Sequence, residues 1–177
     1  LPPVDAEFLV DIGKKYLKGI NLPQDTTRAI EMFNAAQRIG QGDTNFDGTF
    51  FSLRISKLVL EHYKGMKWKS EEEIEWGFDR SNGTLIIKGE GPLDDYADGN
   101  KTCKMKDYDW VNEPPWVKKY GDQITSVVIC YGVSSIDENA FYDCSMLESV
   151  VLPISVTSIG DSAFSDCSGL ECVSIPN

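Results

Sequence analysis

The residue types that most often carry chemistry in proteins are few in this sequence and poorly spaced for it. Cysteine occurs at Cys103, Cys130, Cys144, Cys167 and Cys172. An odd number argues against a complete set of disulfides, and the lack of CxxC spacing argues against a zinc site. The one histidine, His62, stands far along the sequence from every cysteine, so as a base or metal ligand it would act nearly alone. We expect free thiols and a packed or surface histidine.

The carboxylates are no better arranged for catalysis or metal binding. Glu71, Glu72 and Glu73 are consecutive, whereas calcium-binding loops interleave their ligands with turn residues, so we expect a solvated helical turn there. Asp94 and Asp95 are adjacent and diverge in an extended chain, while the acid pair of a glycosidase converges across a cleft of roughly 5 to 9 Å. Motifs of serine hydrolases, phosphate-binding loops, dinucleotide-binding folds and zinc proteases do not occur. The sequence therefore predicts a protein without enzymatic activity, metal or cofactor.

The overall charge limits the classes of partner. Seventeen basic and 28 acidic side chains give a formal net charge of −11, which repels nucleic acid and anionic lipid headgroups. No apolar run approaches the roughly 20 residues that cross a bilayer. The first residues lack the basic region and apolar core of a signal peptide, which would have to precede them in a secreted protein. We expect no nucleic-acid partner and no membrane insertion within this chain.

The carboxy-terminal third repeats itself with an offset of 23 residues. Residues 135–153, "SIDENAFYDCSMLESVVLP", and residues 158–176, "SIGDSAFSDCSGLECVSIP", share their apolar positions. The equivalent positions are Ile124, Leu147 and Leu170; Val127, Val150 and Val173; Ile129, Leu152 and Ile175; Phe141 and Phe164; Cys144 and Cys167. Identical coils stacked in register bury like on like, so this pattern predicts a solenoid with parallel strands and small buried cysteines at its turns.

Residues 5–65 have the apolar spacing of amphipathic helices. Gly19 and Gly40 are typical of helix ends, Asp25 of a helix start, and a third helix is expected to close at Gly65. The stretch "FLVDIGKKYLKGINLPQDTTRAIEMFNAAQRIG" resembles a SEL-like repeat, a relative of the tetratricopeptide helix pairs. The matching residues are Leu9, Gly13, Tyr16, Gly19, Asp25, Ala29, Phe33, Ala35, Ala36 and Gly40. The resemblance implies an interaction scaffold, and a plain helical bundle is the alternative. Only about one and a half units are present where arrays need about three, so another part of the chain must cover the exposed end.

The middle of the chain changes character after residue 66. Residues 64–75 turn abruptly from apolar-periodic to charged and mark a module boundary. From Trp76 the apolar period becomes two, and Asn82-Gly83 predicts a tight β-hairpin turn. Residues 88–123 lack periodicity and are expected to form an ordered, irregular cap.

Residues 76–177 resemble the BspA-like leucine-rich repeat family, through the hairpin, the "PPW" segment and the "SIG..AF..CS.L" coil. Cys130 stands where the family pattern has proline, and the array is short. The resemblance implies a surface or secreted protein of host-associated bacteria or parasitic protists that acts in adhesion to other cells. We therefore expect an α+β chain: a helical SEL-like module over residues 1–66, a hairpin and irregular cap over 67–123, and a leucine-rich-repeat solenoid with a parallel sheet over 124–177.

Two surfaces are candidates for binding. The strand positions expected to point away from the solenoid core are Ser126, Val128, Ser149, Val151, Cys172 and Ser174. These residues either contact a protein partner or are merely solvated. The aromatic residues of the cap are Tyr96, Tyr108, Trp110, Trp116 and Tyr120. They could form a platform for sugar rings, although filling of the core is the simpler interpretation.

The expected partner is another protein, on a host or neighbouring cell. A glycan ligand and a role as an intracellular scaffold are alternatives, and end-to-end self-association at the last coil is a further possibility. Asn82 and Asn100 each begin an N-x-T sequence, which would matter only in a secreted eukaryotic protein.

Overall fold

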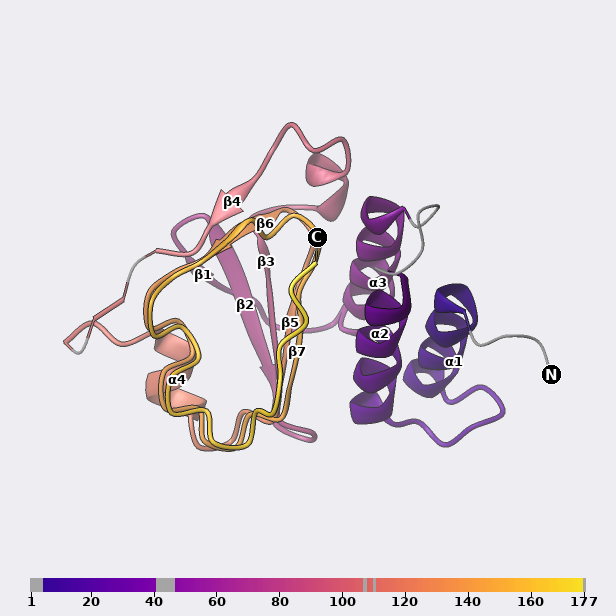
Figure 1. Cartoon of the computed structure of the whole chain (residues 1–177), viewed down its shortest axis with the longest axis horizontal. Coiled ribbons are helices and arrows are strands. Elements are labelled where there is room, and N and C mark those ends of the chain that lie inside the picture. Colours follow the sequence, from indigo (N-terminus) through magenta and orange to yellow (C-terminus); the bar gives the residue numbers. More distant parts are fainter. Residues whose placement is uncertain (1–4, 41–46, 107, 110, 177) are drawn as a thin grey trace.

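The computed structural model describes residues 5–40, 47–106, 108–109 and 111–176, in which three helices precede a stack of β-coils (Figure 1). The helices are α1 (Ala6–Lys18), α2 (Thr26–Gly40) and α3 (Gly48–His62). α1 ends at Gly19 in the left-handed conformation, and the Asp25 carboxylate accepts a hydrogen bond from the Arg28 N–H at 3.0 Å at the start of α2. Both predicted helix boundaries are therefore confirmed. α1 and α2 approach closely at Gly13, because glycine has no side chain. A Cβ there would lie 2.5 Å from the Phe33 ring.

Two sheets form the walls of the stack. The larger has the order β1-β2-β3-β5-β7, and the smaller has the order β4-β6-β8. Their strands are β1 (Lys69–Glu71), β2 (Ile74–Asp79), β3 (Thr84–Gly89), β4 (Cys103–Lys104), β5 (Ser126–Ile129), β6 (Val133–Ile136), β7 (Ser149–Val151) and β8 (Ser158–Ile159). The 3-10 helix η1 (Leu93–Tyr96) and helix α4 (Pro115–Tyr120) lie in the segment between β3 and β5.

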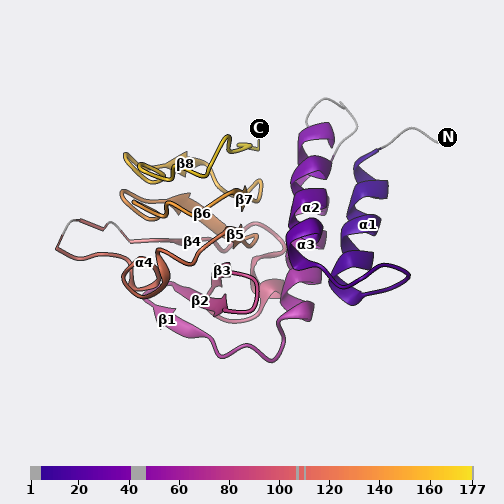
Figure 2. The same cartoon turned by 90° about the horizontal axis from the view of Figure 1, so that it is seen from below.

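The strands pair in parallel at the 23-residue offset read from the sequence. Val127 of β5 lies opposite Val150 of β7, and Ile136 of β6 lies opposite Ile159 of β8. At the other end β1, β2 and β3 are antiparallel, and β3 continues the larger sheet by pairing in parallel with β5 (Figure 2). The predicted hairpin cap and parallel sheet are confirmed.

The interior of the stack is built from the repeated apolar columns, except that Ile175, expected in the column of Ile129 and Leu152, is 55% exposed in the last coil. Phe141 and Phe164 stack with ring centroids 5.3 Å apart and planes inclined by 16°. The Cys167 thiol donates to the Phe141 carbonyl at 3.1 Å, the role expected of a small residue at a coil turn. The Trp116 indole N–H of α4 donates to the Ala140 carbonyl at 2.8 Å, which fixes the cap on the first coil.

The outer face of the larger sheet is covered by α2 and α3. Ile86, Val128 and Val151 of the sheet share one buried cluster with the apolar stripes of these helices. Ser56 Oγ of α3 accepts a hydrogen bond from the Tyr131 N–H at 2.8 Å. In the next coil, Ser52 Oγ, one helical turn away on α3, accepts the equivalent hydrogen bond from the Ile154 N–H at 2.9 Å.

One helical turn of α3 thus matches one coil of the stack. α3 lies along the stacking direction (Figure 2). On α2, the Gln37 side-chain amide donates to the Leu152 carbonyl at 2.9 Å. The sheet therefore supplies the cover that the short helical module was expected to need.

The structure corrects three details of the middle segment. Glu71 belongs to strand β1 and Glu72 has a φ of 54° in the following turn, so the expected helical turn is wrong. β1 forms because its backbone pairs with β2, which needs no apolar side chains. The hairpin loop has four residues, 80–83, and among its described residues only Gly83 has positive φ (73°). The segment 88–123, expected to be irregular, contains η1, β4 and α4.

Candidate binding groove

The strand face proposed for binding is only partly accessible. Ser126, Val128 and Val151 are 2%, 1% and 1% exposed. The expectation that they face solvent is wrong, because α2 and α3 pack against this face. Ser126 Oγ lies 3.1 Å from Ser149 Oγ, so its hydroxyl is also used within the sheet.

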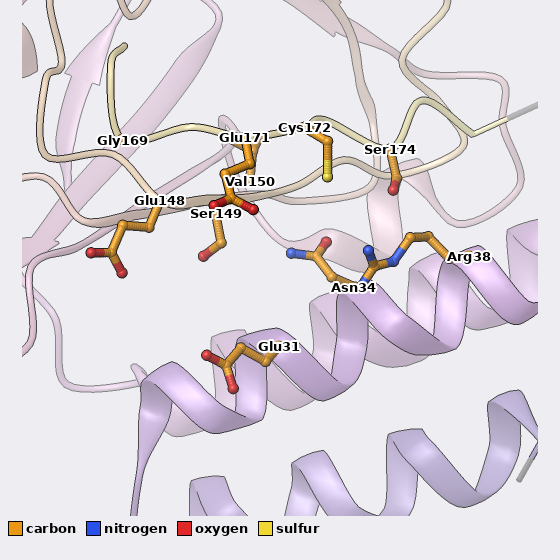
Figure 3. Close-up of a pocket in the computed structure, with 10 residues that line it drawn as sticks. All are labelled: Glu31, Asn34, Arg38, Glu148, Ser149, Val150, Gly169, Glu171, Cys172 and Ser174. Carbon is orange, nitrogen blue, oxygen red and sulfur yellow. The ribbon is translucent and has the colours of Figure 1, made fainter.

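The other three residues of that face line a groove beside α2. Ser149 and Ser174 are half-buried and Cys172 is exposed. The groove has a volume of about 420 Å³ and is bordered by α2 on one side and by the last two coils on the other (Figure 3). We call it the α2 groove, and its lining residues are Glu31, Asn34, Arg38, Glu148, Ser149, Val150, Gly169, Glu171, Cys172 and Ser174.

The charged side chains of the α2 groove come from both walls. Glu31 lies on α2, whereas Glu148 and Glu171 occupy equivalent positions of successive coils, 23 residues apart. Arg38 is the single cation among the lining residues, so three carboxylates and one guanidinium leave a formal charge of −2. None of the ion pairs between described residues joins Arg38 to these carboxylates.

A buried acceptor adds to the polar character of the α2 groove. Asn34 Oδ1 is shielded from solvent and has no hydrogen-bond partner within the described part of the chain. An unsatisfied acceptor favours a ligand that brings N–H donors. Together with the excess of carboxylates, this makes the groove suited to a cationic, donor-rich group.

The aromatic residues of the cap do not form a surface platform. Tyr96, Tyr108, Trp116 and Tyr120 are all buried in the core between the sheets. The proposed sugar-binding platform is wrong for these four, because they pack against each other and against the strands, as in the edge-to-face contact of Trp116 with Tyr108 at 5.5 Å. Trp110, the fifth member, lies outside the described residues.

Burial changes the pKa of two cysteine thiols and of the histidine. Burial raises the pKa of the Cys130 and Cys144 thiols to about 12, which keeps both thiols protonated and unreactive. Burial lowers the pKa of His62, whose ring meets the Tyr63 ring edge-on at 4.7 Å. Among the described residues, no group of three or more histidine, cysteine, aspartate or glutamate side chains could hold a metal ion. In the same part of the chain, no helix has the length and apolar character needed to span a membrane.

The α2 wall of the groove is not apparent from the sequence. Glu31, Asn34 and Arg38 lie on the polar face of a helix, and nothing local indicates that a sheet stands opposite them. Glu148 and Glu171 could have been found, since the 23-residue offset places both in one column.

Comparisons with known proteins bear on the coil region. Residues 119–177 match the family model described as a BspA type leucine rich repeat region, which identifies the stacked coils as leucine-rich repeats. The match does not extend to the helices, so their assignment as a SEL-like module stays a prediction. No curated protein matched the chain.

Two solved structures are similar to the chain. A leucine-rich repeat protein from Eubacterium ventriosum has 30% sequence identity, with 60% of this chain and 25% of that chain covered, at a TM-score of 0.48. The T. pallidum leucine-rich repeat protein has 20% identity, with 62% of this chain and 50% of that chain covered, at a TM-score of 0.34. The chain thus spans a quarter and a half of these two proteins.

Proposed function

We propose that this chain is a non-catalytic protein-recognition module and that the α2 groove is its contact surface. One observation carries the proposal. Ser149, Cys172 and Ser174 are accessible between α2 and the last coils. The other three candidate strand residues, Ser126, Val128 and Val151, are buried. The match of residues 119–177 to leucine-rich repeats supports the same class of function, since such repeats present extended surfaces to protein partners.

The chemistry of the groove favours a basic, extended segment of the partner. Its lining carries a formal charge of −2, and the chain as a whole carries −11, which would accelerate encounter with a cationic partner at low salt. A volume of about 420 Å³ accommodates a few side chains rather than a folded domain. Lysine or arginine side chains of the partner would lie between Glu31 on α2 and the Glu148–Glu171 column.

The same proposal includes a role in adhesion, at the cell surface or outside the cell. Its support is the BspA type of the matched repeats. Detection of the native protein on intact cells or in the culture medium, and not in the cytoplasmic fraction, is the expected result. A glycan-binding role has no comparable support, because the described aromatic residues of the cap are buried.

A displayed library of random peptides tests the groove directly. We expect enrichment of peptides with two or more lysine or arginine residues, whose binding is measured by isothermal titration calorimetry. The variant Glu171→Lys reverses a charge in the groove and is expected to weaken binding at least about tenfold, which corresponds to about 1.4 kcal/mol.

The matched control reverses an exposed charge away from the groove. Glu138→Lys changes the net charge equally and is expected to leave the affinity of the enriched peptides within about twofold at physiological salt. Equal weakening in both variants, or enrichment of peptides without basic residues, would contradict the proposed recognition at the groove.

A further inference from the structure

Three cations gather around Trp76 and Tyr120 at the hairpin end of the stack. Lys69 lies on β1, and its ammonium is 5.1 Å from the centre of the Trp76 ring. Lys119 of α4 lies with its ammonium 5.4 Å from the centre of the Tyr120 ring. We call Lys69, Arg80 and Lys119 the cationic cluster.

Arg80 joins the other two cations through Tyr120. Its guanidinium carbon is 5.4 Å from the Tyr120 ring centre, and Nη2 donates to the Tyr120 hydroxyl at 3.3 Å. The Trp76 and Tyr120 rings are in edge-to-face contact at 6.3 Å, so the two rings hold all three cations over one small area. Aromatic faces attract cations, which explains how the side chains are positioned.

The cationic cluster is unusual for a chain with a net charge of −11. None of the ion pairs between described residues involves Lys69, Arg80 or Lys119, although seven other basic residues of the described chain have carboxylate partners. The contact with Lys119 lowers the pKa of Lys69 and the contact with Lys69 raises the pKa of Lys119, so the two amino groups lie close together, where two positive charges repel each other. An anion bound between these groups would relieve the repulsion.

The side-chain chemistry selects the type of anion. A guanidinium offers a planar fork of donors, and an ammonium offers three donors around a point charge. The Tyr120 hydroxyl accepts from Arg80 and keeps its own hydrogen to donate. Donors that arrive from β1, from the loop after β2 and from α4 suit a tetrahedral dianion with four oxygens better than a planar carboxylate with two.

We propose that Lys69, Arg80 and Lys119 form a binding site for a tetrahedral oxyanion, sulfate or phosphate, free or as the terminal group of a larger ligand. This site is independent of the α2 groove and of the function proposed for it.

Titration of the ¹⁵N-labelled chain by NMR tests the site, with sodium sulfate, sodium phosphate and sodium acetate as probes at constant ionic strength. We expect saturable shifts of the Trp76 indole and Tyr120 amide signals with sulfate and with phosphate, and at least about tenfold weaker binding of acetate. The double variant Lys69→Gln/Lys119→Gln is expected to weaken sulfate binding at least about tenfold.

The control removes the same charge elsewhere on the surface. Lys14→Gln/Lys15→Gln changes α1, far from the cationic cluster, and is expected to keep the wild-type affinity for sulfate. Shifts that do not saturate, equal binding of acetate, or equal losses in the two double variants would each overturn the proposal. Binding of only one of the two tetrahedral anions would also overturn it, because the geometry offers no means to tell them apart.

Discussion

Replacing Ser56 by alanine tests how α3 is attached to the coils. Ser56 is 2% exposed, and its Oγ accepts the Tyr131 N–H at 2.8 Å. Tyr131 is itself buried, so in the variant its N–H would stay shielded from water without an acceptor. The substitution removes one oxygen atom and little packing, which separates the hydrogen bond from the apolar contacts of the helix.

The expected loss follows from the asymmetry of buried hydrogen bonds. An orphaned buried donor costs about 1–3 kcal/mol, so Ser56→Ala is expected to lower the free energy of unfolding by that amount. In a protein of this length, ~1 kcal/mol shifts the melting temperature by about 2–4 °C. Ser52→Ala frees the Ile154 N–H one coil higher and is expected to cause a smaller loss, because that hydrogen bond is only partly buried.

Urea unfolding measures both losses. We expect a lower midpoint with an unchanged slope, because the surface exposed on unfolding stays the same. Ser70→Ala removes a hydroxyl from an exposed position on β1 and is expected to change stability by less than about 0.5 kcal/mol. If Ser56→Ala were as mild as Ser70→Ala, the hydrogen-bonded match between helix turns and coils would be refuted.

Two further substitutions test the stack and its junction with the helices. Phe141→Ala is expected to lower the free energy of unfolding in urea by about 3–5 kcal/mol, because the side chain is fully buried. Phe164→Ala should lower it by less, because that ring is half-exposed. A larger loss for Phe164→Ala than for Phe141→Ala would contradict the stacking. At Asp79, burial raises the pKa, but hydrogen bonds, including one from the Tyr63 hydroxyl of the helical segment, outweigh it and lower the pKa overall. The stability contributed by Asp79 is therefore present above the unfolded-state pKa and lost as the pH falls through the folded-state pKa. Asp79→Asn should accordingly have a lower free energy of unfolding than the wild type at pH 7. The difference in free energy should become smaller as the pH is lowered to about 3. A difference that stays constant or becomes larger would argue against these hydrogen bonds.

The coil stack was predictable because each coil repeats the same apolar positions. Phe141 and Phe164, or Cys144 and Cys167, occupy equivalent positions 23 residues apart, and stacking in register is the arrangement that buries them together. Helix ends were likewise predictable from single residues, such as Gly19 and its left-handed backbone. These features depend on local chemistry or on an exact repeat.

The position of the helices on the sheet could not be predicted in the same way. It depends on contacts between residues far apart in the sequence, such as Ser56 with Tyr131 and Gln37 with Leu152. One signal was present, since Val128 and Val151 are apolar at positions that would face solvent in a one-sided sheet. Continuous apolar runs are typical of strands that are covered on both faces.

The helical cover also determines which of the candidate strand residues are accessible. With Ser126, Val128 and Val151 under the helices, the accessible members of the six candidate strand residues are those that border the α2 groove, Ser149, Cys172 and Ser174. A partner that binds in the proposed groove therefore contacts α2 and the last coils together. Charge reversal at Glu31, on the α2 wall, is therefore expected to weaken the same interaction as Glu171→Lys on the coil wall.

The alkylation rates of the native thiols test the covered face most directly. Cys130 is fully buried beneath the helices, whereas Cys172 is exposed in the α2 groove. With iodoacetamide at pH 8, read out by mass spectrometry of the peptides, we expect Cys172 to react at least ~100-fold faster than Cys130 in the folded protein and at a similar rate in urea. Comparable rates for the two thiols in the folded protein would contradict the packing of α2 and α3 on the sheet.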